Sequence, residues 1–148
     1  MALLDHENLD AYQRSIDFLA LALRLASGLA RGEREIREQL KRAAMSVPLN
    51  IAEGAGKPTS GDRARYHAIA RGSAMECAAL LDVCRVAKLV GAEDVEAGKV
   101  LLARIVAMLT KIPSVRPWTR TATRTRTETI TITSTTTTTH HARSGRPV

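Results

Sequence analysis

QLKRAAMSVPLNIAEG, residues 39–54, is the stretch that decides how this chain folds. Its apolar residues recur three and four positions apart, which is the spacing of one face of an α-helix. They are Leu40, Ala43, Ala44, Val47 and Ile51, with Ile36 one turn earlier. Pro48 lies inside this pattern and has no backbone N–H, so we expect a kink or local break between residues 44 and 48. The pattern predicts a helix over residues 33–53 that ends at the loop GAGKP.

Two further segments show the same helical period on either side of this one. The first helix is predicted to begin at a capping residue, Asn8 or Asp10, and to run to about residue 30. The third is predicted to run to about residue 90, where Gly91 is a natural stop, from a cap at Thr59, Ser60 or Asp62. The rows expected to face the core are Leu9, Tyr12, Ile16, Leu19, Leu23 and Ala26 in the first helix, and Tyr66, Ile69, Ser73, Cys77, Leu80, Cys84 and Ala87 in the third.

A fourth helix is predicted over about residues 93–112, with Leu102, Ile105 and Leu109 on its apolar face. The 148 residues are 45% hydrophobic but only 3% aromatic, which suits helices packed by aliphatic side chains and disfavours an all-β sandwich. Four helices with short turns predict an all-α protein, an antiparallel up-down four-helix bundle over residues 1–113. Residues 114–148 are rich in Thr and Arg without a lasting apolar period, so we predict a disordered C-terminal tail.

The formal net charge of +7 is unevenly distributed along the chain. Residues 1–112 hold 16 Lys or Arg against 14 Asp or Glu, whereas residues 113–148 hold six Arg and one Glu. A nucleic-acid role for the bundle must therefore rest on how a few basic residues are arranged. The candidates lie along the second helix and around the loop that follows it: Arg34, Arg37, Lys41, Lys57, Arg63 and Arg65.

Two rows of polar residues lie beside the apolar rows of the central helices. Their members are three or four positions apart, so each row shares one helix face. The rows are Ser46, Asn50 and Glu53 on the second helix, and Ser73 and Glu76 on the third. Buried polar groups need partners, for which Arg42 and Arg71 are candidates, and Gly72 predicts a close backbone approach. We expect an inter-helix network that fixes register or subunit contacts, with a ligand-binding site as the alternative.

The motifs that would carry chemistry match known sites poorly. EGAGK at residues 53–57 lacks the first Gly and the final Ser or Thr of a phosphate-binding loop, and it follows a predicted helix. Arg63 and His67 are the residue types of a helical-bundle ribonuclease of the HEPN type, but only three residues separate them. The His and Cys residues lack the spacing of a zinc site. We predict that the chain is not an enzyme and uses no cofactor or metal.

Compartment signals point to the cytoplasm. The start MALLDHENLD contains no Lys or Arg, unlike a secretory signal peptide. The apolar stretch over residues 18–29 is interrupted by Arg24 and is shorter than a membrane span. Cys77 and Cys84 lie seven residues apart on one predicted helix and cannot bond to each other without breaking it. We therefore predict a cytoplasmic protein with reduced thiols and no membrane partner.

The two central helices resemble the bacterial four-helix bundle proteins known as the 23S rRNA-intervening-sequence family. Residues 39–54 match the family pattern of Gln-Leu, a basic residue, Arg-Ala-Ala, and then a Ser, Pro and Asn-Ile-Ala-Glu-Gly at fixed spacing. The run Ile69-Ala-Arg-Gly-Ser-Ala-Met-Glu76 matches a second mark, I-A-x-G-S-x-x-E. The resemblance covers about residues 8–112. Tyr66 stands where the family usually has Phe, and the Thr/Arg tail lies outside the family pattern.

This resemblance implies a fold and partners. The family is similar to the accessory variability protein of diversity-generating retroelements, and the relatives imply an up-down bundle that forms a homopentamer without enzymatic activity. The retroelement relative also binds reverse transcriptase and nucleic acid through a basic surface. Our lead hypothesis is therefore a non-catalytic homo-oligomer that binds structured RNA or a nucleoprotein partner. The alternative is a structural adaptor that binds protein only.

Overall fold

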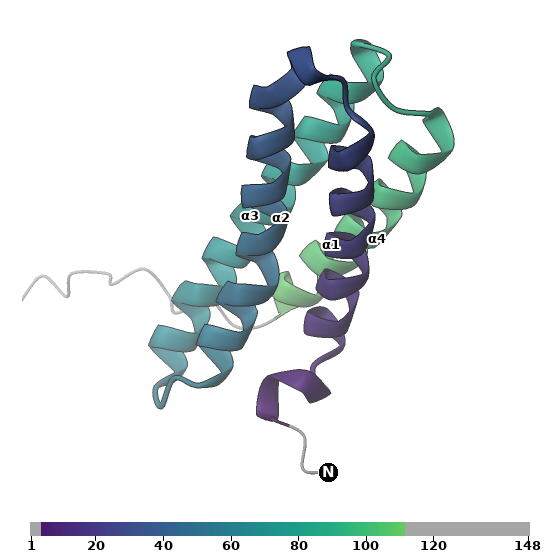
Figure 1. Cartoon of the computed structure of the whole chain (residues 1–148). Helices are drawn as coiled ribbons and strands as arrows, with labels where there is room; N and C mark the ends of the chain where they lie inside the picture. Colours follow the sequence, from purple (N-terminus) through teal and green to yellow (C-terminus); the bar gives the residue numbers. More distant parts are fainter. Residues whose placement is uncertain (1–3, 112–148) are drawn as a thin grey trace, which may run out of the picture. The chain divides into compact units, whose positions relative to one another are not determined.

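The computed structural model describes residues 4–111, which form four α-helices and two short 3-10 helices (Figure 1). The predicted tail over residues 114–148 lies outside the described residues. No strand occurs between residues 4 and 111, so the predicted all-α class is confirmed. The elements are η1 (Asp5–Asn8), α1 (Asp10–Gly28), η2 (Arg31–Glu33), α2 (Arg34–Ala55), α3 (Ser60–Val86) and α4 (Ala92–Lys111).

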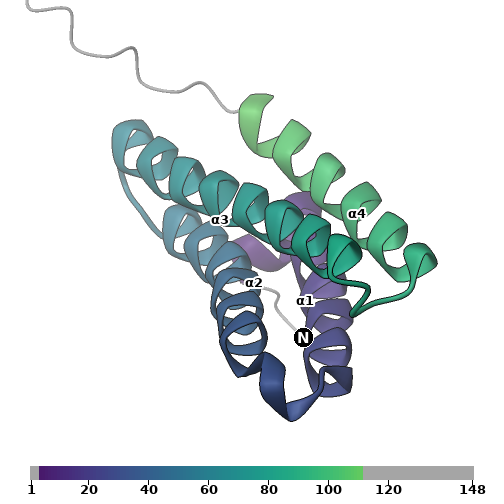
Figure 2. The same cartoon turned by 90° about the horizontal axis from the view of Figure 1, so that it is seen from above.

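The helices pack in chain order around one core, as an up-down bundle requires. Each helix contacts the next one along the chain, and α4 returns to contact α1. The turns between them are short, so neighbouring helices run antiparallel. Figures 1 and 2 show α2 and α3 side by side over most of their length, where the bundle makes its most extensive helix–helix contact. This contact carries both sequence marks of the predicted family.

The second and fourth helices bury the residues that their sequence patterns predict. Leu40, Val47 and Ile51 of α2 are fully buried, and so is Ile105 of α4. Pro48 does not break α2, which is helical without interruption through Ala55. Because Pro48 has no N–H, the carbonyl four residues earlier lacks its intrahelical donor, and the buried neighbours keep this turn helical.

The predicted core rows of α1 and α3 are wrong by a rotation about each helix axis. In α1, Ile16 and Leu23 are about two-fifths exposed, and in α3 Ile69 is exposed to a similar degree. Small residues share the core positions with Phe18, Leu25 and Leu81. Ala26, Cys77 and Cys84 belong to both the predicted and the observed rows. The residues buried in these helices are Ala11, Ser15, Phe18, Ala22, Leu25 and Ala26 of α1, and His67, Ala70, Ala74, Cys77, Leu81 and Cys84 of α3.

Helix ends are fixed differently from the prediction in two places. Leu9 precedes α1 without a side-chain cap, because η1 leads the chain directly into the helix, so neither Asn8 nor Asp10 is the cap. Thr59 caps α3 as predicted, since its Oγ1 accepts a hydrogen bond from the Asp62 amide at 3.1 Å. The end of α3 comes at Val86, before the predicted stop at Gly91.

The turn after α3 is made by a lysine. Lys88 has φ 56°, in the left-handed region that favours glycine. Its conformation lets the Leu89 amide donate to the Cys84 carbonyl at 2.9 Å and the Lys88 amide donate to the Arg85 carbonyl at 3.1 Å. These bonds satisfy carbonyls that the helix end leaves open.

Candidate functional site

The polar rows of α2 and α3 meet at the centre of their contact. The hydroxyls of Ser46 and Ser73 lie 2.8 Å apart, which joins the two helices directly. Asn50 donates from Nδ2 to the Ser46 carbonyl at 2.8 Å and to the Ser46 hydroxyl at 3.0 Å. All three side chains are half-buried. The structure therefore brings Ser46, Asn50 and Ser73 together as an inter-helix cluster.

The two predicted glutamates lie outside this cluster and belong to separate contacts. Glu76 accepts from Gln39 Nε2, and Gln39 in turn accepts from Arg42, which makes a second bridge between α3 and α2. Glu53 instead pairs with Lys57 at 2.5 Å within one turn of chain. A single network of five residues is thus wrong, because Glu53 turns outward and is exposed while Ser46 and Asn50 face α3.

Below this cluster, Gly54 and His67 form the closest approach of α2 to α3. A Cβ at position 54 would lie 3.1 Å from His67 Cδ2, His67 Nε2 and Tyr66 Cβ. Sequence reasoning placed the close approach at Gly72, which is exposed with no other group within 4 Å of a Cβ built there. Gly54 therefore has the packing role that was assigned to Gly72.

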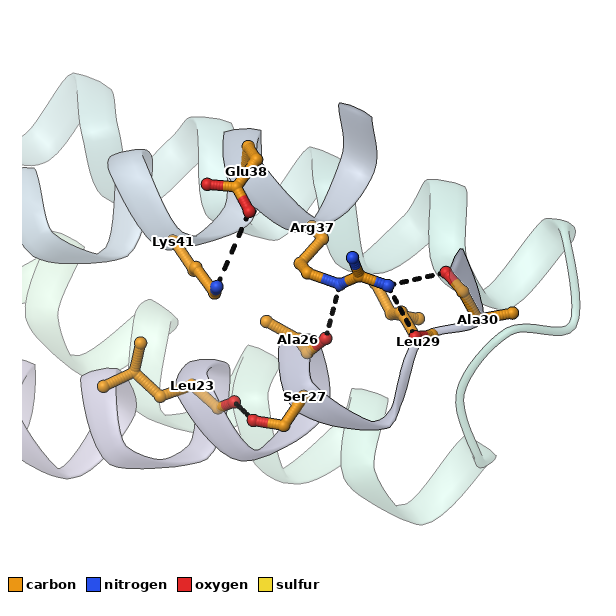
Figure 3. A network of polar contacts seen from close by, with 8 residues as sticks. All are labelled: Leu23, Ala26, Ser27, Leu29, Ala30, Arg37, Glu38 and Lys41. Carbon is orange, nitrogen blue, oxygen red and sulfur yellow. Dashed lines mark hydrogen bonds and ion pairs between the residues drawn. The ribbon is translucent and has the colours of Figure 1, made fainter. Parts of the chain in front are cut away.

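The side chain of Arg37 makes hydrogen bonds to the backbone of the same chain. Its guanidinium, shown in Figure 3, donates to three backbone carbonyls at the end of α1: Ala26 at 3.2 Å, Leu29 at 2.7 Å and Ala30 at 2.6 Å. The last carbonyls of a helix have no intrahelical partners and carry the negative end of the helix dipole. Arg37 therefore closes the α1–α2 turn, and its donors are engaged there.

The other predicted nucleic-acid contacts fall into two groups. Lys41 lies 3.6 Å from Glu38 (Figure 3), and Lys57 pairs with Glu53 and lies over the Tyr66 ring, 4.9 Å from its centre. The hydrogen bond that Lys57 donates to Glu53 raises the pKa of Lys57 and keeps it charged. Arg34, Arg63 and Arg65 are exposed and form no ion pair with any residue between 4 and 111.

These unpaired arginines do not form one patch. Arg34 begins α2, whereas Arg63 and Arg65 lie in the first turns of α3, at the other end of the long α2–α3 pair. A helix of 22 residues such as α2 is about 33 Å long, which sets the scale of this separation. The basic surface of one chain is therefore divided between the two ends of the bundle.

An apolar groove between α1 and α2 is a feature that sequence reasoning missed. It has a volume of about 230 Å³ and a lining that is almost entirely apolar. Leu49 at its edge is 67% exposed and extends this apolar lining to the surface. The sequence did mark part of this groove: Tyr12, Ile16 and Leu19 belong to the row that was predicted to face the core. The orientation of α1 turns this row toward the groove instead. The lining residues are Tyr12, Ile16, Leu19, Met45, Pro48, Leu49 and Ala52.

A second apolar surface lies on α3. Met75, Val83 and Val86 are each about half-exposed or more, and Ala79 between them is exposed as well. Their spacing of three and four residues places them on one face of the helix. We call these four residues the α3 ridge. One chain thus carries an apolar groove on α1–α2 and an apolar ridge on α3.

The described residues offer little for acid–base or metal chemistry. Only 7% of His67 is exposed, so its ring does not reach a substrate from solution as a ribonuclease residue would. Burial and the charge of Glu76 raise the pKa of Cys77 to about 12, which keeps this thiol protonated and unreactive. Between residues 4 and 111 no three His, Cys, Asp or Glu side chains gather as a metal site. None of the helices in this range combines the length and apolar character that a membrane crossing requires.

Comparison with known proteins shows which family the chain belongs to. The chain matches the family model described as 23S rRNA-intervening sequence protein over residues 7–111, which takes in all four helices and both sequence marks. No curated protein matches the chain. Since the match covers most of the sequence, the resemblance found in the central helices is confirmed: the chain belongs to the 23S rRNA-intervening sequence protein family.

Proposed function

We propose that this protein is a non-catalytic, cytoplasmic assembly protein, a homo-oligomer in which the α1–α2 groove of one copy receives the α3 ridge of the next. The observation that carries the proposal is the groove itself. Contiguous exposed apolar surfaces, as opposed to single exposed apolar residues, are a feature of protein–protein contacts. This proposal corresponds to the alternative hypothesis, a structural adaptor that binds protein only.

A second copy is the occupant because the same chain carries both surfaces. Contacts between two different faces of identical subunits are heterologous, and they close into a ring when the rotation between copies allows it. The α3 ridge offers unbranched and β-branched apolar side chains to a groove with few polar atoms. The family resemblance favours five copies per ring.

The size of the full-length protein in solution, measured by light scattering, tests this assembly. We expect a multimer for the wild type and monomers for Leu49→Glu in the groove and for Met75→Glu on the ridge. Val100→Glu is the matched control, because Val100 is a comparably exposed apolar residue on α4 outside both surfaces. A monomeric wild type at micromolar concentration contradicts the proposal.

Mixing the two variants separates a heterologous interface from a symmetric one. Leu49→Glu keeps an intact ridge and Met75→Glu keeps an intact groove, so one good interface remains between them and the mixture should give dimers. A symmetric groove-to-groove contact instead leaves Met75→Glu dimeric on its own, because both of its grooves are intact, and mixing then brings no Leu49→Glu into the dimers.

Binding of structured RNA is the second candidate function. It is favoured by Arg34, Arg63 and Arg65, which have no ion pair among residues 4–111. In one chain these arginines are divided between the two ends of the bundle. A ring of several copies would repeat them and so concentrate positive charge. A nucleoprotein partner would bind to the same arginines.

Filter binding of structured RNA to the full chain at several salt concentrations tests this candidate. Each phosphate contact that is lost should flatten the dependence of log affinity on log salt by about one unit. We expect Arg63→Gln with Arg65→Gln to weaken binding and reduce this slope, whereas Arg37→Gln should leave the slope unchanged, since Arg37 binds carbonyls. An affinity that does not depend on salt contradicts RNA binding through these residues.

A further inference from the structure

His67 is a buried ionisable group without a hydrogen-bond partner. Only 7% of the residue is exposed, and both ring nitrogens are shielded from solvent. No donor or acceptor within residues 4–111 lies in hydrogen-bond reach of Nδ1 or Nε2. A buried imidazole tolerates this only in its neutral form, because a charged ring would bring two unpaired N–H donors and a charge into an apolar site.

The position of the ring links its state to the packing of two helices. Its Cδ2 and Nε2 atoms occupy the space in which a side chain at position 54 would lie, 3.1 Å from a Cβ built there. Gly54 belongs to the last turn of α2, and His67 to the second turn of α3. The contact therefore joins these helices next to the turn that connects them. If the ring left this site, the last turn of α2 would lose its packing contact with α3.

The surrounding charges oppose protonation of His67. Arg63, one turn earlier on α3, lowers the pKa of His67 together with burial, which is the larger cause. On α2, Glu53 and Lys57 pair with each other at 2.5 Å, so that carboxylate is already engaged. The other charged residues around this end of the bundle do not contribute to the pKa shift of His67; they are Asp5, Glu7 and Asp10 before and in α1, Asp62, Arg65 and Arg71 in α3, and Lys111 in α4.

We propose that the Gly54–His67 contact is an acid-sensitive element that holds the α2–α3 turn closed at neutral pH and opens it as the ring takes up a proton. In the open form the ring is solvated and titrates near its ordinary pKa of about 6.5. The closed form is therefore favoured above that pH and loses population as the pH falls below it, because only the open form binds the proton.

Hydrogen–deuterium exchange of the full chain tests this element, with rates corrected for the intrinsic pH dependence of exchange. One pH unit below the ordinary pKa, near pH 5.5, opening of the α2–α3 turn should increase by about tenfold relative to pH 7.5. Amides in the middle of α4 should not follow this change. The same increase over the whole bundle, or none at the turn, overturns the proposal.

Two variants show whether His67 is the group responsible. His67→Met fills the site with a flexible apolar side chain and should abolish the pH response of the turn. Should His67→Met not fold, Gly54→Ala provides the second test, since it displaces the ring toward solvent and should reduce the response. His6→Gln, at a half-buried histidine in η1, is the matched control and should keep the wild-type response. A response that persists in His67→Met, or one of wild-type size in Gly54→Ala, overturns the proposal.

Discussion

Arg37 in the first turn of α2 donates from Nη2 to the carbonyl of Leu29, the residue that caps the end of α1, at 2.7 Å. Two further carbonyls at the same helix end accept from this guanidinium. One side chain thus fixes the angle at which the chain passes from α1 to α2. Arg37, which the sequence predicts as a surface charge, in fact connects α2 to the end of α1.

Arg37→Lys separates these two roles, because it keeps the charge and removes the planar set of donors. We expect it to lower the free energy of unfolding by about 2 kcal/mol, the range of hydrogen bonds made by charged groups. Urea denaturation measures this loss. Arg34→Lys, three residues earlier and without a partner among residues 4–111, should change stability by less than about 0.5 kcal/mol. Equal effects of the two substitutions would contradict the assigned role.

Gly72 and Gly54 should respond to alanine in opposite directions. Gly72 is exposed within α3 with open space around its missing Cβ, so Gly72→Ala should stabilise the protein by about 0.5–1 kcal/mol through helix propensity. Gly54→Ala gains the same propensity but presses against the His67 ring and Tyr66 Cβ, and we expect a net loss of stability. Thermal unfolding of both variants gives the comparison, and a stabilised Gly54→Ala would show that the α2–α3 contact yields easily.

Lys88 should be replaceable by glycine with a gain in stability. Its φ of 56° costs an ordinary residue about 1 kcal/mol, which glycine does not incur. Lys88→Gly should therefore raise the free energy of unfolding by about that amount in a denaturant titration. Gly91 has no positive φ, so Gly91→Ala is the matched control and should show no loss. A destabilised Lys88→Gly would mean that the lysine side chain contributes more than its backbone costs.

The sequence predicts α2 and α4 well because each has one dominant apolar row. In α1, two apolar rows compete: the predicted row from Leu9 to Ala26, and the buried row, which runs from Ala11 through Phe18 to Ala26. Both rows have helical spacing and large apolar side chains, so the period alone does not choose between them. Ser15 is fully buried there only because its hydroxyl donates to the Tyr12 carbonyl at 2.6 Å. The choice depends on neighbouring helices and cannot be read from α1 alone.

Some of the candidate sites can also be predicted from the sequence, and others cannot. Helical spacing predicts that Ser46 and Asn50 share a face, and complementary spacing on α3 adds Ser73, so this cluster follows from the sequence. The exposed groove does not follow, because it results from how far α1 rotates. Partners of single charged residues are also set by tertiary distance, as the engagement of Arg37 with the end of α1 illustrates.

The two cysteines should be unreactive while the bundle is folded. Both are fully buried, and at pH 8 a thiol whose pKa is about 12, as for Cys77, has roughly a thousandfold less thiolate than an ordinary one. We expect neither to react with a thiol-specific reagent at pH 8 in native buffer, and both to react in urea. Leu49→Cys, exposed at the edge of the groove, is the positive control in monomeric or diluted protein. Rapid labelling of the native wild type would show that α3 leaves the core on the time scale of the reaction.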